Sequence, residues 1–167
     1  MKKKIRIILS ISSDIGYYLA KDWLKKKLFV IGTYRKKTNK VKELEALGAK
    51  TFYCDIKKNN SIDLVSQKIS KFGKWNTIVL AAGDQNPIGK IIDLNFNNFE
   101  DSIKVNFINQ MRFLKNLLKK RDNKASKIPS VLFFAGGGTN NATTNYMAYT
   151  ISKIASIKAV ELLDAEV

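Results

Sequence analysis

Residues 5–16 read Ile5-Arg-Ile-Ile-Leu-Ser-Ile-Ser-Ser-Asp-Ile-Gly16, a mostly apolar run that leads into a serine-rich turn. The run from Ile5 to Leu9 is short and has no clear polar alternation, which is typical of a strand buried on both faces of a parallel sheet. An amphipathic helix is expected directly afterwards, from Ile15 to Lys27. A buried strand that passes through a tight turn into a helix is the repeating unit of an α/β fold.

The same alternation continues to the end of the chain. Further strands are expected over residues 28–34, 51–53, 77–82 and 131–134, and further helices over residues 39–47, 61–72, 99–120 and 146–164. Asn-Asn pairs at 59–60, 97–98 and 140–141 indicate loops, and the polar stretch 119–127 indicates a surface connection. Strict alternation of strand and helix predicts a doubly wound α/β fold, with helices on both faces of a parallel sheet.

The chain has 167 residues, a length that fits one domain. It contains one cysteine and no histidine, which excludes an internal disulfide, a histidine-based catalytic triad and a typical zinc centre. No apolar run is long enough to span a membrane. The apolar run after the basic first residues is also too short for the core of a signal peptide, so we expect a cytoplasmic protein.

The formal net charge is +16 at pH 7, which raises the question of a nucleic-acid partner. Lysines carry most of this charge and are scattered along the whole chain, and only four of the 30 basic residues are arginines. A solvated lysine coat is therefore the favoured interpretation, and a functional surface for polyanions is the alternative. The charge also suits an anionic substrate or cofactor, which composition alone does not select.

The turn from Ser10 to Gly16 is a candidate phosphate site. Free backbone N–H groups at the start of a helix, aided by the helix dipole, can bind a pyrophosphate. A dinucleotide-binding fingerprint would place glycine at positions 10, 14 and 16, and only Gly16 is present. The alternative is a serine-rich turn in which Asp14 or Ser13 caps the helix. A carboxylate at position 14 would repel a pyrophosphate unless it turned away.

The end of the second expected strand reads Gly32-Thr-Tyr-Arg-Lys-Lys37 and contains no acidic residue. A carboxylate here would bind the ribose 2′-hydroxyl of NAD. The guanidinium of Arg35 instead offers a planar fork for a 2′-phosphate, with charge added by Lys36 and Lys37. If a dinucleotide binds, the sequence therefore favours NADP over NAD. Ordinary surface basicity is the alternative.

Tyr149 and Lys153 lie four residues apart in the last expected helix, which places them on one face and one turn apart. An ammonium group at this distance favours the ionised form of a phenol. The pair can therefore donate and accept a proton near neutral pH. The alternatives are a half-buried core tyrosine and an exposed helical lysine.

In chain order, these motifs resemble the short-chain dehydrogenase/reductase family over essentially the whole chain. The turn 10–16 stands where the family has its glycine-rich turn, Asp55 where it has an adenine-binding aspartate, and Ala82-Gly83 where its fourth strand closes. The resemblance implies one Rossmann-like NAD(P)-binding domain over residues 1–167, with strand order 3-2-1-4-5. It implies cofactor contacts from Ser10, Ser12, Ser13, Asp14, Ile15, Gly16, Arg35, Asp55, Ile56, Ala81, Ala82, Gly83, Tyr149 and Lys153.

The resemblance also implies an NAD(P)-dependent oxidoreductase that reduces a carbonyl or oxidises a secondary alcohol by hydride transfer. Tyr149 would act as acid and base, and Lys153 would hold the nicotinamide ribose and favour the ionised tyrosine. Asn106 would hold a water that relays protons to Lys153. The stretch Phe134-Ala-Gly-Gly-Gly-Thr-Asn140 is similar to a bacterial subgroup of surface-polysaccharide and nucleotide-sugar pathways. A nucleotide-linked sugar is therefore a candidate substrate.

The family's carbonyl-orienting serine has no counterpart, because its place falls on Ala135 or Gly136. Thr139 carries the nearest hydroxyl, which either swings into the site, helped by the flexible glycines, or ends a turn. Leu80 and Ala81 replace two asparagines of the fourth-strand motif. Loss of a preorganised donor would lower the rate by a factor of about a hundred or more.

The chain also stops soon after the Tyr–Lys helix, where the family continues with further strands and a substrate-binding loop. We therefore expect a C-terminally truncated domain with little turnover. A non-catalytic dinucleotide-binding module or inactive fragment is the alternative, and a basic nucleic-acid-binding protein is less favoured. A homodimer is expected, because the family pairs its two long helices across a dimer axis. The expected face, which could equally pack on the chain's own sheet, comprises Phe107, Met111, Leu114, Ile154, Ile157 and Val160.

Overall fold

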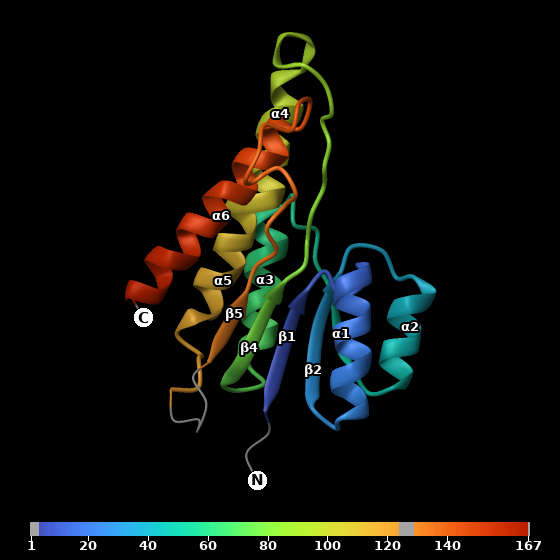
Figure 1. The fold of residues 1–167 in the computed structure, drawn as a ribbon. Coiled ribbons are helices and arrows are strands. Elements are labelled where there is room, and N and C mark those ends of the chain that lie inside the picture. Colours follow the sequence, from blue (N-terminus) through green and yellow to red (C-terminus); the bar gives the residue numbers. More distant parts are fainter. Residues whose placement is uncertain (1–3, 124–128, 167) are drawn as a thin grey trace.

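A computed structural model describes residues 4–123 and 129–166 of the protein (Figure 1). Five strands form one parallel sheet in the order β3-β2-β1-β4-β5. The strands are β1 (Ile5–Leu9), β2 (Phe29–Tyr34), β3 (Lys50–Tyr53), β4 (Trp75–Leu80) and β5 (Ser130–Leu132). The parallel pairing and the strand order confirm the fold expected from the sequence.

Helices follow the strands in the expected alternation. They are α1 (Asp14–Lys25), α2 (Asn39–Ala46), α3 (Asn59–Ser70), α4 (Phe96–Ile103), α5 (Asn109–Leu118) and α6 (Met147–Glu166). A short 3₁₀ helix, η1 (Ile91–Asp93), precedes α4, and a π-helical turn, η2 (Lys104–Ile108), joins α4 to α5. Among the described residues, no helix combines the length and the apolar character needed to cross a membrane.

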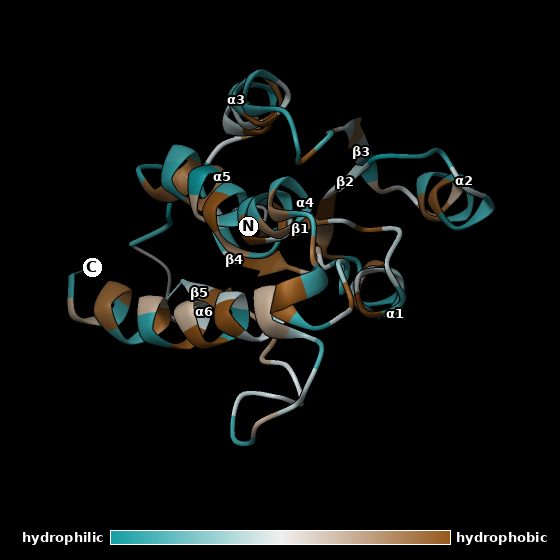
Figure 2. Cartoon of the chain, turned by 90° about the horizontal axis from the view of Figure 1, so that it is seen from above, coloured by the Kyte–Doolittle hydropathy of each residue, from teal (hydrophilic) through white to brown (hydrophobic). Residues whose placement is uncertain are grey.

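Side chains of β1 alternate between two apolar cores, one on each face of the sheet. Ile5, Ile7 and Leu9 belong to the core that α3 and α5 cover, and Ile8 belongs to the core that α1 and α2 cover. Figure 2 shows α3 and α5 on one side of the sheet and α1 on the other. Every residue of β4 is buried, as expected of an inner strand of a doubly covered sheet. Helix α6 packs against α4 and η2.

The predicted helix 99–120 is wrong in its start and in its continuity. It begins at Phe96, because the Asn95 side chain accepts hydrogen bonds from the N–H groups of Asn97 and Asn98 at 2.9 and 3.3 Å. The π-helical turn η2 then interrupts the regular α-helical hydrogen bonding. The Asn-Asn pairs at 59–60 and 97–98 accordingly lie in the first turns of helices rather than in loops.

Two other expectations need correction. The fourth strand starts at Trp75 and not at residue 77. The Trp75 N–H donates to the Lys120 carbonyl at 2.9 Å, which joins the start of the strand to the residues that follow α5. The expectation that Leu114 lies on a dimer face is wrong, because Leu114 is fully buried in the chain's own core beside Phe113 and Leu117. Of the surface connection expected at 119–127, residues 124–127 lie outside the described part of the chain.

Candidate active site

Two cavities lie along the carboxyl edge of the sheet, and both are lined by Ala82 and Gly83 after β4. The nucleotide cavity, as we name the first, has a volume of about 280 Å³ and lies at the ends of β1, β2 and β3. The reaction cavity, the second, has a volume of about 470 Å³ and lies between the turn after β1 and helix α6. Ligands of open α/β sheets bind at this edge, where neighbouring strands connect in opposite directions.

The turn after β1 is held by its own serine residues. Ser13 caps α1, since its Oγ accepts a hydrogen bond from the Gly16 N–H at 3.1 Å and donates to the Ser10 carbonyl at 2.8 Å. Ser10 has a φ of 66°, a left-handed conformation that costs a non-glycine residue about 1–2 kcal/mol. The Thr33 hydroxyl steadies this residue by accepting the Ser10 N–H at 3.0 Å. The missing glycine at position 10 is thus replaced at a conformational cost.

Gly16 remains because no side chain fits at its position. A Cβ atom there would lie 2.5 Å from the Ser10 carbonyl oxygen and 3.1 Å from the Ile11 Cα, and both are backbone atoms of the turn. Only glycine lets α1 start this close to the strand. The one glycine that the sequence keeps from the fingerprint is therefore the one that close packing requires.

The start of α1 presents backbone donors to the two cavities. In residues 4–123 and 129–166, no acceptor pairs with the N–H groups of Ser12, Asp14 or Ile15. The Asp14 carboxylate pairs with Lys40 of α2, with Oδ1 and Nζ 2.5 Å apart, and the hydrogen bond from Lys40 lowers the pKa of Asp14. Ser13 rather than Asp14 is therefore the cap, and Lys40 compensates the carboxylate that would oppose an anion at this turn.

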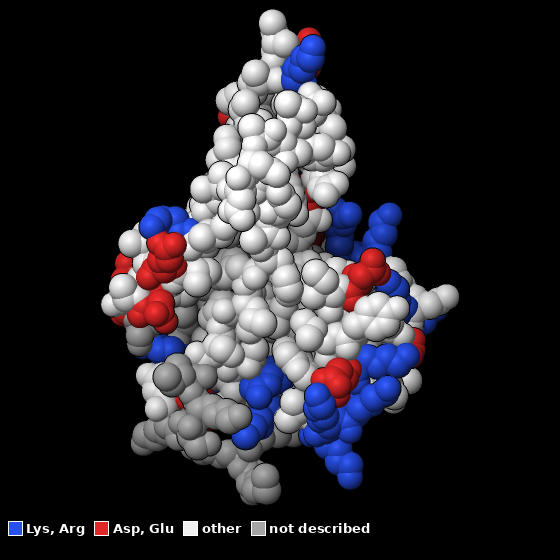
Figure 3. Space-filling model, in the orientation of Figure 1, with Lys and Arg blue, Asp and Glu red and all other residues white. Residues whose placement is uncertain are grey.

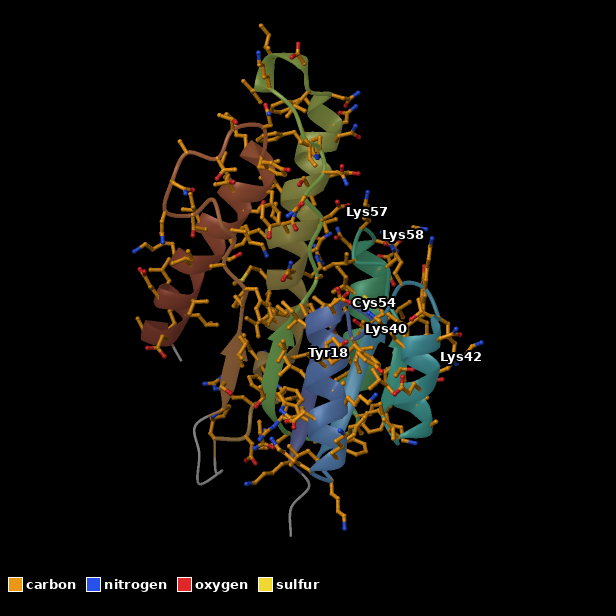
Figure 4. The ribbon with its side chains drawn as sticks, turned by 45° about the vertical axis from the view of Figure 1, so that its right-hand side comes forward. Tyr18, Lys40, Lys42, Cys54, Lys57 and Lys58 are labelled. Carbon is orange, nitrogen blue, oxygen red and sulfur yellow. The ribbon has the colours of Figure 1, made fainter. Side chains whose placement is uncertain are left out.

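Basic side chains surround the nucleotide cavity. Arg35 and Lys36 line it from the end of β2, whereas Lys37 turns to Glu45 of α2, with Nζ and Oε2 3.0 Å apart. Lys57 lines the cavity from the loop after β3, and Figure 4 shows it with Lys58 at the top of α3. Nothing in the sequence singles out Lys57, because lysines occur along the whole chain.

Asp55 does not line the nucleotide cavity, although its neighbours Cys54 and Ile56 do. Its side chain accepts a hydrogen bond from the Lys57 N–H at 3.1 Å, and its own N–H donates to the Ser61 hydroxyl at 2.9 Å. The residue therefore shapes the loop in this structure. Burial raises the pKa of the Cys54 thiol to about 11, so the thiol stays protonated at neutral pH.

Tyr149 and Lys153 of α6 line the reaction cavity. Ser13, Asp14 and Ile15 line it from the start of α1. Lys153 is only 5% exposed, and burial lowers the pKa of its ammonium group. Its Nζ lies 5.3 Å from the centroid of the Tyr149 ring, a cation–π distance. Within the described ranges, this ammonium makes no ion pair. A buried cation beside a phenol is an arrangement suited to proton transfer.

Position 136 has no room for a side chain in this arrangement. A Cβ atom on Gly136 would lie 2.8 Å from Cε1 of Tyr149 and 3.1 Å from Cγ of Lys153. Thr139 donates from both its hydroxyl and its N–H to the Gly136 carbonyl, at 2.9 and 3.2 Å, and it lines neither cavity. Of the two interpretations of Thr139, this geometry matches the residue that ends a turn.

Asn106 lies behind the site and is 1% exposed, in the π-helical turn η2. Its Oδ1 accepts the Asp84 N–H at 2.9 Å, and its Nδ2 donates to the Asp84 carbonyl at 2.7 Å and to the Ser102 carbonyl at 3.0 Å. The side chain thus holds the loop that follows β4. It lines neither cavity, so the structure brings it to the site through Asp84.

Two further buried amides that the sequence analysis missed act in the same way. Asn109 Nδ2 donates to the Ile56 carbonyl at 2.6 Å, and Gln110 Nε2 donates to the Ala82 carbonyl at 3.0 Å. Gln110 Nε2 also lies 3.2 and 3.1 Å from the Val105 and Asn106 carbonyls of the π-helical turn. The signal in the sequence is a cluster of amides on the helix face that also carries Phe113, Leu114 and Leu117, because buried amides need partners.

Comparison with known proteins gives a family match. A family model described as enoyl-(acyl carrier protein) reductase matches residues 11–166. A search among curated proteins found no match. A short-chain dehydrogenase from Streptomyces avermitilis has 22% identity and a TM-score of 0.87 over 99% of this chain and 61% of its own. Thermoplasma acidophilum aldohexose dehydrogenase has 20% identity and a TM-score of 0.85 over 99% of this chain and 62% of its own.

A third similar structure, actinorhodin polyketide ketoreductase with NADPH, has 20% identity and a TM-score of 0.86 over 98% of this chain and 65% of its own. The chain therefore spans 61% to 65% of the length of these three proteins. At such identities the likeness shows the fold. Since the family model covers nearly the whole sequence and these structures share its fold, the chain belongs to the short-chain dehydrogenase/reductase family.

Proposed function

We propose that this chain is an NADP-dependent oxidoreductase that reduces a carbonyl or oxidises a secondary alcohol. One observation carries the proposal: Tyr149 and Lys153 open into the same cavity as the start of α1 and as Ala82-Gly83. A proton donor and acceptor therefore lies beside a place that is suited to a bound dinucleotide. The substrate is a small carbonyl or alcohol compound, and a nucleotide-linked sugar is one candidate.

The residues present fit a dinucleotide. The N–H groups of Ser12, Asp14 and Ile15 would hold the pyrophosphate, and Arg35 and Lys36 would hold the 2′-phosphate in the nucleotide cavity. Within the described residues, neither Arg35 nor Lys36 pairs with a carboxylate, and two such free cations favour the extra phosphate of NADP over NAD. When bound, the nicotinamide supplies the hydride.

Tyr149 would give its hydroxyl proton to the carbonyl oxygen in reduction and take it back in oxidation. The Lys153 ammonium would stabilise the phenolate that remains and hold the nicotinamide ribose. Burial supports this role, because the field of a cation acts more strongly where water is excluded. Asn106 would position Asp84 behind the site, and its water relay to Lys153 stays a prediction.

The matching experiment uses the 167-residue chain with NADPH and a panel of ketones, aldehydes and nucleotide-linked keto sugars. Tyr149→Phe is expected to abolish turnover and to leave NADPH affinity, measured by calorimetry, within about twofold of wild type. Tyr18→Phe is the matched control, since Tyr18 is exposed on α1 and lines neither cavity. Equal turnover in wild type and Tyr149→Phe would refute the assignment of Tyr149.

The cofactor preference has its own test. Arg35→Gln is expected to weaken NADPH binding about tenfold or more and to leave NADH binding nearly unchanged, because only NADPH carries the 2′-phosphate. Lys37→Gln is the control, since Lys37 pairs with Glu45 and does not line the nucleotide cavity. Equal losses for both nucleotides would contradict a 2′-phosphate site at Arg35.

A non-catalytic dinucleotide-binding module is the second candidate, and the closed position 136 favours it. NADPH binding with no turnover on any carbonyl would select this candidate. A nucleic-acid-binding role has less support. Figure 3 shows acidic side chains among the basic ones on the visible face, and its upper part is largely uncharged. A duplex-binding protein would present a continuous basic surface instead.

We also propose a homodimer through the outer side of α6. Ile154, Ile157 and Val160 are 48%, 40% and 37% exposed along this helix. An exposed apolar row of this kind is a common feature of subunit interfaces. Light scattering after size exclusion tests the proposal, and a monomer at all concentrations would contradict it.

A further inference from the structure

We propose that the Gln85 side-chain amide donates the second hydrogen bond to the reacting substrate oxygen, beside the Tyr149 hydroxyl. The proposal rests on the proposed oxidoreductase function and deepens it. A carbonyl oxygen gains negative charge as hydride adds to the carbon, and preorganised donors aimed at that oxygen lower the barrier. Tyr149 supplies one donor, so the remaining donors of the reaction cavity decide where a second comes from.

The side chains that line the reaction cavity leave one free neutral donor. Asp14, Ile15, Ala81, Ala82, Gly83 and Phe134 have no side-chain hydrogen to donate at neutral pH. The Ser13 hydroxyl donates to the Ser10 carbonyl at 2.8 Å. Lys153 lies over the Tyr149 ring and carries the ribose role in the proposed function. Gln85 remains, and in the part of the chain that the structure describes its amide makes no hydrogen bond.

Other hydroxyls do not compete with Gln85. Position 136 has no room for a side chain, because a Cβ atom would lie 2.8 Å from the Tyr149 ring. The Thr139 hydroxyl donates to the Gly136 carbonyl and does not line the cavity. The donor therefore comes from the loop after β4, which carries Gln85.

The backbone on both sides of Gln85 is anchored. Asn106 binds the N–H and the carbonyl of Asp84 at 2.9 and 2.7 Å, and the Asp84 carboxylate accepts hydrogen bonds from the N–H and the side chain of Asn86 at 3.0 and 2.9 Å. The exposed Gln85 side chain is thus presented to the cavity from a fixed main chain. A fixed base under a free amide is what a substrate-orienting group needs.

The amide also suits both directions of the reaction. Its NH₂ group donates to a carbonyl oxygen, and its own oxygen can accept the hydrogen of an alcohol. Tyr149 transfers the proton in either direction, and Gln85 neither gains nor loses one. Gln85 is accordingly a catalytic residue by contact with the reacting oxygen and not by proton transfer.

Gln85→Leu in the 167-residue chain tests the proposal, with Gln67→Leu as the matched control. Gln67 is exposed on α3 and lines none of the cavities described above. We expect kcat/KM of Gln85→Leu to fall about 100-fold, as for the loss of one oxyanion donor. NADPH affinity by calorimetry and the thermal midpoint should stay at the control's values, because within the described residues the exposed Gln85 amide makes no hydrogen bond to the turn after β1 or to the core.

Gln85→Glu adds a signature that a structural role would not produce. An ionised carboxylate only accepts hydrogen bonds, whereas a protonated one donates. The activity of Gln85→Glu relative to wild type should therefore rise as the pH falls toward about 4–5, the ordinary range for a glutamate. The relative activity of Gln85→Leu should not change with pH.

The outcomes separate this proposal from the function on which it rests. Turnover by wild type with unchanged kcat/KM in Gln85→Leu overturns the role of Gln85 and leaves the oxidoreductase in place. A loss of NADPH affinity in Gln85→Leu as large as its loss of kcat/KM also overturns this role, because Gln85 would then bind the cofactor. Wild-type binding of NADPH with no turnover overturns both the catalytic function and this proposal.

Discussion

Replacing Gly136 by alanine inserts one methyl group between the loop after β5 and the Tyr149–Lys153 pair. The new Cβ would lie 2.8 Å from Cε1 of Tyr149 and 3.1 Å from Cγ of Lys153. Ordinary contacts between carbon atoms are about 3.5–4.0 Å, so the ring must move by about 0.7 Å or more. Overpacking of this kind costs about 1–3 kcal/mol. For a domain of this size we expect Tm to fall by about 2–12 °C.

Gly137→Ala is the matched control, because no heavy atom lies within 4 Å of the place its Cβ would take. Both variants are compared with wild type by thermal unfolding followed by circular dichroism. The Gly137 variant should stay within about 1 kcal/mol of wild type, since replacing an unstrained glycine mainly restricts the unfolded chain. Equal Tm values for the two variants would refute the close packing of Gly136 against the ring.

The same contact makes a prediction about activity. Gly136→Ser places a hydroxyl beside the tyrosine, and the family's serine at this place would suggest a gain in turnover. The structure predicts a loss, because the ring is displaced before the hydroxyl can serve as a donor. NADPH affinity should be little changed. A clear gain in kcat for Gly136→Ser would show that the ring yields easily and that the packing argument is wrong.

Three further predictions follow from the contacts of the site. Lys153 has a lowered pKa, so its unfolded state binds more protons between the folded pKa and about 10.4, and wild-type stability rises with pH across that window. Lys153→Met should therefore be more stable than wild type at pH 7 in urea titrations, by a margin that shrinks toward pH 10. Asp14→Asn removes the carboxylate at the start of α1 and should tighten NADPH binding about two- to fivefold at low salt, with a smaller effect at high salt by calorimetry. Gln110→Leu leaves buried carbonyls without their donor and should lower the unfolding free energy by about 1–3 kcal/mol, which an unchanged urea midpoint would contradict.

The order of elements was readable from the sequence because each strand is a short apolar run and each helix has an apolar face. The alternation and the parallel sheet followed from these patterns, and the cap at Ser13 was one of two options that local chemistry allowed. Asparagine was ambiguous, because it favours loops and helix N-caps alike. Asn95 therefore caps α4 at a place where a loop is equally compatible with the sequence. No local pattern indicates η2, whose Asn106 is bound to Asp84 of a distant loop.

The candidate site likewise has one part that the sequence predicts and one part that it does not. The positions of Tyr149, Lys153 and the turn 10–16 relative to the sheet follow from their places after strands and on a helix. The partners of charged side chains do not, because ion pairs form between segments that folding brings together. Lys40 pairs with Asp14 at the start of α1, whereas Lys37 pairs with Glu45 of α2. Two lysines that look alike in the sequence therefore have different partners.

Periodicity and spacing are local properties of the chain, so they are enough to predict the parallel α/β fold and a tyrosine and a lysine on one helix face. How the site is filled depends on the packing of distant segments. The Tyr149 ring packs on Gly136 and leaves no room for a side chain at position 136. The Thr139 hydroxyl donates to the Gly136 carbonyl. Among the described residues, the Gln85 amide in the reaction cavity has no hydrogen-bond partner. These outcomes depend on which atoms from distant segments share a small volume, and no local pattern in the chain records that.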